Sequence, residues 1–226
     1  MIFWNFLSDK DNWHPIARRP CYPPIHKISL TSDAAGCNEK TKADERVGCA
    51  SMGIDEKGYI FFASQTFWDK KVLLNTVDAN GKRMGAKTTT LEFLGILIPF
   101  LLIPEKLCNK HITVEVDNIS CVYAWENKFS RQDNMASILV RALHMIPFYL
   151  GSIIYALHLP RMSTWEASMV DRMSRKSTTS EKDRNLINSF RNNPIPDCLS
   201  EWMQNPTEDW DLATKLLDHV EKKINL

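Results

Sequence analysis

The chain has 226 residues, which is enough for one good-sized domain with appendages. Its apolar fraction of 44% and its charged fraction of 24% are those of an ordinary folded globular protein. The formal net charge of +1 argues against a protein that grips nucleic acid through bulk positive charge alone, although a local basic groove can still serve.

The cysteines and the first residues bear on the cellular compartment. The six cysteines are scattered without paired spacing, and residues 1–6 lack the basic and long apolar regions of a secretion signal. We therefore expect free thiols and an intracellular location, in the cytoplasm or the nucleus. Residues 91–103 are strongly apolar, but the run is too short for a membrane span and contains Glu92 and Pro99. We expect a buried helix there and no membrane partner.

Three segments differ in composition. Residues 1–27 are rich in Trp, Pro, Arg and Asp, and their prolines favour an extended connector. Residues 28–175 carry the patterns of one folded domain. Residues 176–226 are predicted to be a linker, polar through residue 184, followed by a tail that ends in an amphipathic helix. The sequence leaves open whether this tail packs on the domain.

Strand patterns come first in the central segment. Residues 55–58, Asp-Glu-Lys-Gly, are a hairpin turn signal between the second and third of these runs. Three consecutive strands joined in this way predict an antiparallel meander. The expected strands are residues 28–33, 47–54 and 59–68.

Helices and strands alternate after the meander. This alternation implies crossover connections, so we predict an α/β fold with a mixed five-stranded sheet and helices on both faces. The expected elements are a helix at 88–104, a strand at 112–117, helices around 121–125 and 135–150, a strand at 153–159 and a helix at 163–175.

Two aspartates end strands on the polar side of the alternation. Asp33 ends the first strand, and Asp117 ends the strand that begins at Ile112. In both strands the apolar residues hold the other parity, so both carboxylates face the same way relative to the apolar residues. If the two strands are neighbours, the carboxylates converge at one end of the sheet. The alternative is two unrelated turn or cap residues.

Two further acids lie in predicted helices. Glu92 follows Thr89 at capping-box spacing, so it either bonds its own helix start or points at the sheet. In the last helix of the domain, Ser163 and Glu166 also form a capping-box pattern, which gives Glu166 a structural role. Asp171 lies about 140° further round that helix and has no capping role, so it is the better candidate ligand.

Four carboxylates at one point repel one another unless cations hold them. Oxygen ligands of this kind suit Mg²⁺, and Mn²⁺ can substitute. Two such ions can activate water and stabilise the leaving oxygen of a phosphodiester. The sequence therefore predicts a site for two metal ions that hydrolyses phosphodiesters, with both catalytic and metal-binding roles for Asp33, Glu92, Asp117 and Asp171.

The motifs around these acids resemble the ribonuclease H fold, in which the corresponding positions bind metal. The resemblance covers about residues 28–175, and the order of strands and helices agrees with it. The motifs are Ser32-Asp33-Ala34-Ala35-Gly36, Thr89-Thr90-Leu91-Glu92-Phe93, Val116-Asp117-Asn118 and Val170-Asp171-Arg172-Met173-Ser174-Arg175.

The details are similar to the ribonuclease H domain of retroelement reverse transcriptases, especially the DIRS-like elements that use a tyrosine recombinase. The most specific stretch is residues 158–164, His-Leu-Pro-Arg-Met-Ser-Thr, which leads to Asp171. Residues 4–7 and 13–16 look like the connection from a polymerase domain, which the resemblance implies as a partner. The loop at 37–46 departs from the family by its length and charge, and no basic handle helix follows the middle helix.

The resemblance also suggests residues that contact the substrate. Asn118 follows the second aspartate, where a polar side chain can bond the 2′-hydroxyl that distinguishes RNA from DNA. His158 is either a histidine that assists product release or proton movement, or a structural one. Lys87, Arg172 and Arg175 are candidates for phosphate contacts, against the alternative of solvated surface charge.

These inferences combine into one predicted activity. We expect a ribonuclease H that cuts the RNA strand of an RNA–DNA hybrid and leaves a 5′-phosphate and a 3′-hydroxyl. One alternative keeps the fold and changes the substrate, as in a DNA nuclease or strand transferase. The other is a connection-like module that binds hybrid without cleaving it.

Overall fold

A five-stranded mixed sheet organises the molecule, which we describe from a computed structural model over residues 26–35, 47–68, 88–131, 133–175, 178–190, 194–204 and 211–225. The strands are β1 (His26–Ala35), β2 (Val47–Asp55), β3 (Ile60–Trp68), β4 (Lys110–Val116) and β5 (Ile153–His158). Their order is β3-β2-β1-β4-β5, with β1, β2 and β3 antiparallel and with β4 and β5 parallel to β1. The predicted mixed sheet is confirmed.

The hairpin between β2 and β3 turns where its sequence predicts. The Asp55 carboxylate accepts hydrogen bonds from the backbone N–H groups of Lys57 and Tyr59, both at 2.9 Å. Gly58 has a φ of +83°, a left-handed conformation that costs glycine little because it has no Cβ. The turn fixes the register of β2 against β3 and, through β2, against β1.

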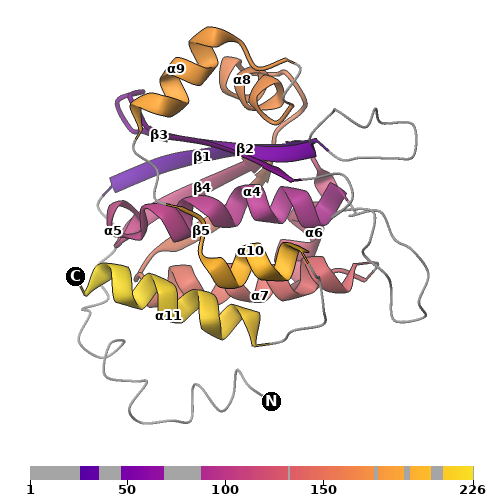
Figure 1. Cartoon of the computed structure of the whole chain (residues 1–226), viewed down its shortest axis with the longest axis vertical. Helices are drawn as coiled ribbons and strands as arrows, with labels where there is room; N and C mark the ends of the chain where they lie inside the picture. The colour runs from indigo at the N-terminus through magenta and orange to yellow at the C-terminus, as the bar shows by residue number, and fades with distance from the viewer. Residues whose placement is uncertain are drawn as a thin grey trace.

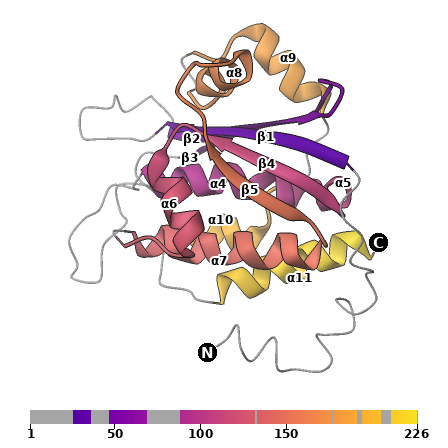
Figure 2. The same cartoon turned by 180° about the vertical axis from the view of Figure 1, so that it is seen from behind.

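Helices cover both faces of the sheet, as predicted (Figures 1 and 2). On one face lie α8 and α9, and on the other lies α4, with α7, α10 and α11 packed beyond it. The helices are α4 (Thr88–Leu102), α5 (Pro104–Leu107), α6 (Ile119–Asn127), α7 (Asn134–Tyr149), α8 (Trp165–Met173), α9 (Glu181–Ser189), α10 (Asp197–Gln204) and α11 (Leu212–Ile224).

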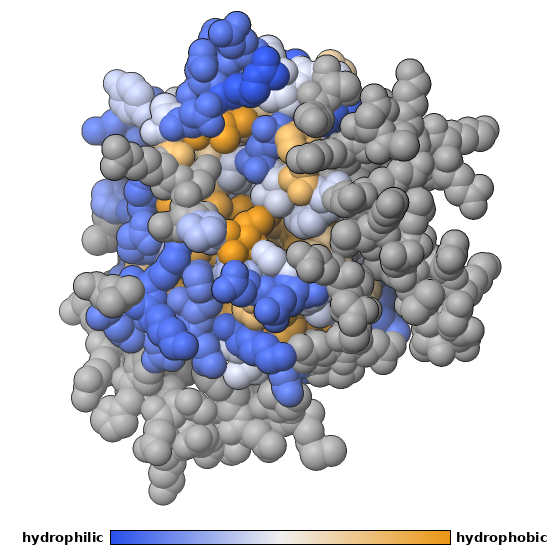
Figure 3. All heavy atoms as spheres, in the orientation of Figure 1, coloured by the Kyte–Doolittle hydropathy of each residue, from blue (hydrophilic) through white to orange (hydrophobic). Residues whose placement is uncertain are grey.

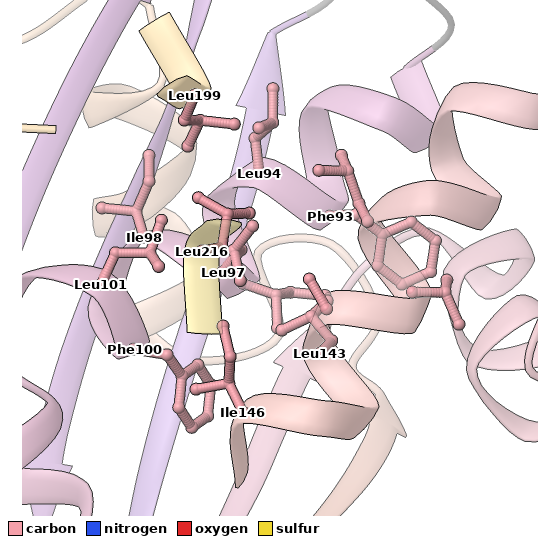
Figure 4. Close-up of a cluster of buried hydrophobic side chains, with 14 of the residues drawn as sticks. Phe93, Leu94, Leu97, Ile98, Phe100, Leu101, Leu143, Ile146, Leu199 and Leu216 are labelled. Carbon is pink, nitrogen blue, oxygen red and sulfur yellow. The ribbon is translucent and has the colours of Figure 1, made fainter. Parts of the chain in front are cut away.

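Helix α4 is apolar on all sides because it is enclosed on all sides. One side packs on β1 and β2, and the opposite side meets α7 and α11, with Leu199 of α10 in the same cluster. Figure 4 shows these contacts, in which α4 side chains lie among residues of the outer helices. The labelled residues are Phe93, Leu94, Leu97, Ile98, Phe100 and Leu101 of α4, with Leu143, Ile146, Leu199 and Leu216 around them. This cluster is the main core of the protein.

Gly95 lets α4 approach the sheet closely. A Cβ atom at this position would lie 3.3 Å from the Cβ of Ser32 and 3.4 Å from that of Cys49. The hydroxyl of Ser51 also donates a 2.6 Å hydrogen bond to the Gly95 carbonyl. The close approach brings the preceding turn of the helix, which carries Glu92, to the end of β1.

The opposite face of the sheet carries a smaller apolar cluster. It joins Met52 and Ala63 of the sheet to Met169, Val170 and Met173 of α8. Figure 3, seen from the same side as Figure 1, shows hydrophilic side chains over α9 and apolar side chains in the band between α9 and the C-terminal helices. Helix α8 is therefore anchored over β1 and β2 by this smaller cluster.

The C-terminal helices pack on the domain. Trp202, Leu216 and Val220 are buried in the same cluster as α4. At the end of α4, the Nζ of Lys223 donates to the Leu102 carbonyl at 3.2 Å, and the Nε2 of His219 lies 3.2 Å from the Leu101 carbonyl. These contacts satisfy carbonyl groups that a helix end leaves without partners.

Several local predictions differ from the structure. Strand β1 runs to Ala35 and does not end at Asp33, and the helix expected at 88–104 ends at Leu102, before the separate α5. Residues 181–184 were expected to be linker but belong to α9, which starts with a capping box between Ser180 and Asp183. Helix α8 starts one residue later than its predicted capping box, because Thr164 is the N-cap and accepts from the N–H of Ala167. Within the described residues, no helix is both long and apolar enough to cross a membrane.

Candidate active site

Asp33 and Asp117 lie side by side because β1 and β4 are parallel neighbours. The register pairs Thr31 with Glu115, and two more residues along each chain bring Asp33 opposite Asp117. Asp33 is on the α8 side of β1 and is 5% exposed. Asp117 follows the last residue of β4 and is partly exposed at the edge of the site.

Glu92 completes a compact group of three carboxylates. One oxygen each from Asp33, Glu92 and Asp117 lies within 4.8 Å of the others. Glu92 is the fifth residue of α4 and is 1% exposed, so its side chain points at the sheet instead of capping its own helix. The N–H of Ala34 bonds its carboxylate. Its Oε2 is buried and has no hydrogen-bond partner among the residues that the structure describes.

Burial makes this group electrostatically costly. Desolvation raises the pKa of Asp33 to about 6; the Ser174 hydrogen bond opposes this rise, and the charges of Asp117 and Asp171 add to it. Desolvation, followed by the charges of Asp33 and Asp117, raises the pKa of Glu92 well above its ordinary value. A cation bound between these carboxylates would offset the penalty.

Asp171 lines the same shallow pocket as Asp33 and Asp117, but it is held by arginines. The guanidinium of Arg161 bonds its Oδ1. Arg175, one turn further along, donates from Nη2 to Oδ1 at 2.8 Å and from Nη1 to Oδ2 at 3.1 Å. Two cations thus pair with the fourth acid, which is outside the compact group of three.

A buried hydroxyl connects two of the acids. Ser174 is 0% exposed, and its Oγ donates a 2.6 Å hydrogen bond to the Oδ2 of Asp33. The same Oγ lies 3.0 Å from the backbone carbonyl of Asp171. The end of α8 is therefore tied to β1 at the site itself.

The remaining candidates occupy different positions. Asn118 caps α6 by accepting from the N–H of Ser120 at 3.0 Å, and it stands next to Asp117. His158 is exposed, and its Nε2 lies 3.1 Å from the Asp117 carbonyl. Arg172 points away from the acids and pairs with Asp183, with its Nη2 3.1 Å from Oδ1. Lys87 lies outside the described residues.

Sequence reasoning missed Arg161 and Ser174 as parts of the site. Arg161 was part of the quoted motif at 158–164 but received no role, because a loop residue has no period from which to infer its direction. Ser174 is three residues after Asp171, a spacing that places two side chains on one face of a helix. That spacing was the available signal.

A groove adjoins the acids on the α6 side. It encloses about 390 Å³ and is lined by residues from the start of α4, from α6 and from the loop before α7. Tyr123 and Phe129 are 57% and 46% exposed in it, and Arg131 is exposed beside them. Aromatic faces beside a cation form a surface on which nucleic-acid bases and phosphates can bind.

No family model matches the chain, and a search of curated proteins found no match. Several solved ribonucleases H are similar in structure. LC11-RNase H1, isolated from compost by a metagenomic approach, has a TM-score of 0.47 at 14% identity over 71% of this chain and 98% of its own. The N-terminal RNase H domain of a Mycobacterium tuberculosis protein also has a TM-score of 0.47 at 14% identity, over 68% of this chain and 99% of its own. RNase H1 of Halobacterium salinarum has a TM-score of 0.43 at 10% identity, over 64% of this chain and 93% of its own.

The strand order, the parallel and antiparallel pairings and the two helical layers define a ribonuclease-H-like domain. The predicted fold class is confirmed on this ground. The roles of the individual acids follow as a proposal.

Proposed function

We propose that this protein is a metal-dependent endonuclease that hydrolyses the RNA strand of RNA–DNA hybrids. The observation that carries the proposal is the group of Asp33, Glu92 and Asp117, with one oxygen of each within 4.8 Å of the others. Two of these acids are almost fully buried without an ion-pair partner among the described residues, and a bound cation would offset the electrostatic cost of their burial.

The donor set fits Mg²⁺ or Mn²⁺. All donors are carboxylate oxygens, and the Oε2 of Glu92, which has no hydrogen-bond partner within the described part of the chain, is available to bind a cation. We assign Asp33, Glu92, Asp117 and Asp171 to hold two ions. The chemistry supplied by bound ions of this kind is the activation of water and the neutralisation of charge on the leaving oxygen.

The chain's own residues supply positioning and proton transfer. To hold an ion, Asp171 would give up bonds to its guanidinium partners, and Arg161, exposed at the pocket rim, would then be free to neutralise phosphate charge. His158, hydrogen-bonded to the backbone of Asp117, lies where it can donate or accept a proton as product leaves. Asn118 keeps its amide N–H₂ group as a donor to a 2′-hydroxyl.

The groove beside the acids is our candidate for binding the strand that is not cut. Tyr123 and Phe129 offer faces to bases, and Arg131 offers charge to phosphate. A near-neutral chain needs such a local surface because its overall charge cannot supply affinity.

The retroelement setting is a further part of the proposal. Its support is the resemblance of residues 158–164 and 170–175 to the ribonuclease H domains of DIRS-like reverse transcriptases. On that ground we propose that the protein acts during reverse transcription, beside a polymerase domain of the same polyprotein.

A cleavage assay tests the proposed activity. A labelled RNA–DNA hybrid is incubated with Mg²⁺ and either the wild type, Asp117→Asn or the control Glu105→Gln, which changes an exposed acid on α5. We expect the wild type and the control to release products with 5′-phosphate and 3′-hydroxyl ends, and Asp117→Asn to lose at least about a hundredfold in rate.

The same assay separates the alternatives. Equal cleavage of duplex DNA would assign the protein to DNA nucleases or strand transferases. Binding of hybrid without cleavage in Mg²⁺ or Mn²⁺ would make it a connection-like binding module. Undiminished cleavage by Asp117→Asn would remove the metal-ion argument altogether.

A further inference from the structure

Ser174 makes a contact that a merely structural serine does not need. Its hydroxyl is buried at 0% exposure and lies 2.6 Å from Asp33 Oδ2 and 3.0 Å from the Asp171 carbonyl. A hydroxyl has one proton to donate, and the shorter bond to a charged acceptor is the stronger. The hydroxyl therefore donates chiefly to Asp33, and the longer bond to the Asp171 carbonyl is the weaker of the two.

The turn that carries Ser174 is held from outside the site. Gln65 of β3 donates from Nε2 to the Met173 carbonyl at 2.5 Å and to the Thr179 hydroxyl at 2.7 Å. The Thr179 hydroxyl in turn donates to the Arg175 carbonyl at 2.8 Å. The end of α8 is thus fixed against β3, so Ser174 is a rigid donor and does not simply follow Asp33.

A carboxylate without such a donor can rotate about its Cβ–Cγ bond. Ser174 fixes this rotation for Asp33 by engaging Oδ2. Because Ser174 is three residues after Asp171, it also ties the helix position of Asp171 to the strand position of Asp33. Donors that orient ligand side chains are as important to a metal site as the ligands.

We propose that Ser174 is a positioning residue that orients the Asp33 carboxylate and sets its distance from Asp171 for metal binding. This inference rests on the proposed function. The competing explanation is a buried hydroxyl that only satisfies a buried acceptor and contributes stability.

A matched control exists elsewhere in the molecule. Thr90 is 4% exposed, and its hydroxyl donates a 2.8 Å hydrogen bond to a carboxylate oxygen of Asp133. Asp133 caps α7 and is outside the group of Asp33, Glu92 and Asp117. Ser174→Ala and Thr90→Val therefore each delete one buried bond from a hydroxyl to a carboxylate, but only the first removes a bond to a proposed metal ligand. Asp133 also lines the groove at α6, so Thr90→Val is the control for metal binding and stability alone.

The experiment compares Mn²⁺ binding by calorimetry, thermal unfolding without metal, and kcat and KM on the labelled hybrid. We expect both variants to lower the unfolding temperature. Ser174→Ala should bind Mn²⁺ about 10- to 100-fold more weakly and lower kcat with little change in KM, whereas Thr90→Val should leave the Mn²⁺ affinity within about twofold of wild type.

The outcomes separate the two proposals. If the wild type binds Mn²⁺ and cleaves hybrid but the two variants have equal Mn²⁺ affinities, Ser174 is structural and the positioning role is wrong. If the wild type neither binds Mn²⁺ nor cleaves, the proposed function fails and this inference fails with it. If Ser174→Ala does not fold, Ser174→Cys replaces it. Its thiol keeps nearly the same volume and is a weak donor, so it should show the same loss of affinity in smaller degree.

Discussion

The two faces of the sheet differ in polarity, although the same strands form both. On the face toward α4, Leu30, Val114 and their neighbours meet a helix that is apolar on all sides and that α7, α10 and α11 enclose. On the face toward α8, Asp33 and Thr31 occupy the alternate positions of the same strand, beside a small apolar cluster. One face therefore supplies most of the burial that stabilises the fold. The other accepts the cost of buried charge.

The comparison predicts that the largest losses of stability come from the α4 face. Phe100 of α4 is 0% exposed and lies in the main cluster. Phe100→Ala should lower the free energy of unfolding by about 3–5 kcal/mol, because it removes buried apolar surface and leaves a cavity. Denaturant unfolding measures this, with Tyr59→Ala as the control, since Tyr59 is 69% exposed and should change stability by less than about 1 kcal/mol. Equal losses would contradict the assignment of the main core.

The acid face should behave in the opposite way. Asp33→Asn removes a buried charge and keeps an oxygen that can accept from Ser174, so we expect the metal-free variant to be more stable than wild type at pH 7.5. The pKa of Asp33 rises from 3.8 to about 6 on folding, which sets an upper limit of about 3 kcal/mol on the gain. Denaturant unfolding with a chelator present measures it.

The pH dependence has a definite sign. Between its ordinary pKa of 3.8 and its folded value of about 6, Asp33 binds more protons in the folded state than in the unfolded state. The stability that protonated Asp33 gives the folded state is fully present below pH 3.8 and is lost as the pH rises through about 6. The advantage of Asp33→Asn should therefore be large at pH 7.5 and small at pH 4.5. An advantage that stays constant over this range would show that the charge of Asp33 is not its cause.

Metal binding should offset the electrostatic cost of burying the carboxylates of Asp33 and Glu92. At saturation near a hundred times the dissociation constant, Mn²⁺ should stabilise the wild type by about 2.7 kcal/mol at pH 7.5. At pH 5 the effect should be much smaller, because protons compete for Asp33 and Glu92, whose pKa values are raised by burial. Thermal unfolding with and without Mn²⁺ at both pH values tests this. An equal shift for Asp33→Asn would place the ion elsewhere.

The sequence could predict the sheet and the direction of two acids, because strands have a period of two. Alternation put Asp33 and Asp117 on the polar side, whereas the pairing of β1 with β4, which the sequence left as a condition, is shown by the structure. Glu92 was ambiguous because helix spacing fits both a cap and a residue directed at the sheet, and its burial beside Asp33 and Asp117 in the structure decides between them. The role of Arg161 could not be predicted from the sequence, since its contact with Asp171 depends on the path of a loop. The capping box of α9 was present in the sequence, but its polar composition indicated a linker.

The smallest expected effect concerns the arginines on Asp171. The Arg161 side chain is 53% exposed, and Arg175 also bonds the same carboxylate, so Arg161→Ala should lower the free energy of unfolding by less than about 1 kcal/mol. Its effect on cleavage should be larger than its effect on stability, because the proposed role of Arg161 begins when Asp171 turns to the ion. Unfolding and hybrid cleavage measured on the same preparation test the difference, with Arg172→Ala as the comparison. Arg172 pairs with the buried Asp183, so its removal should cost more stability and less activity. If Arg161→Ala lost more stability and Arg172→Ala lost more activity, Arg161 would have the structural role and Arg172 the role in cleavage.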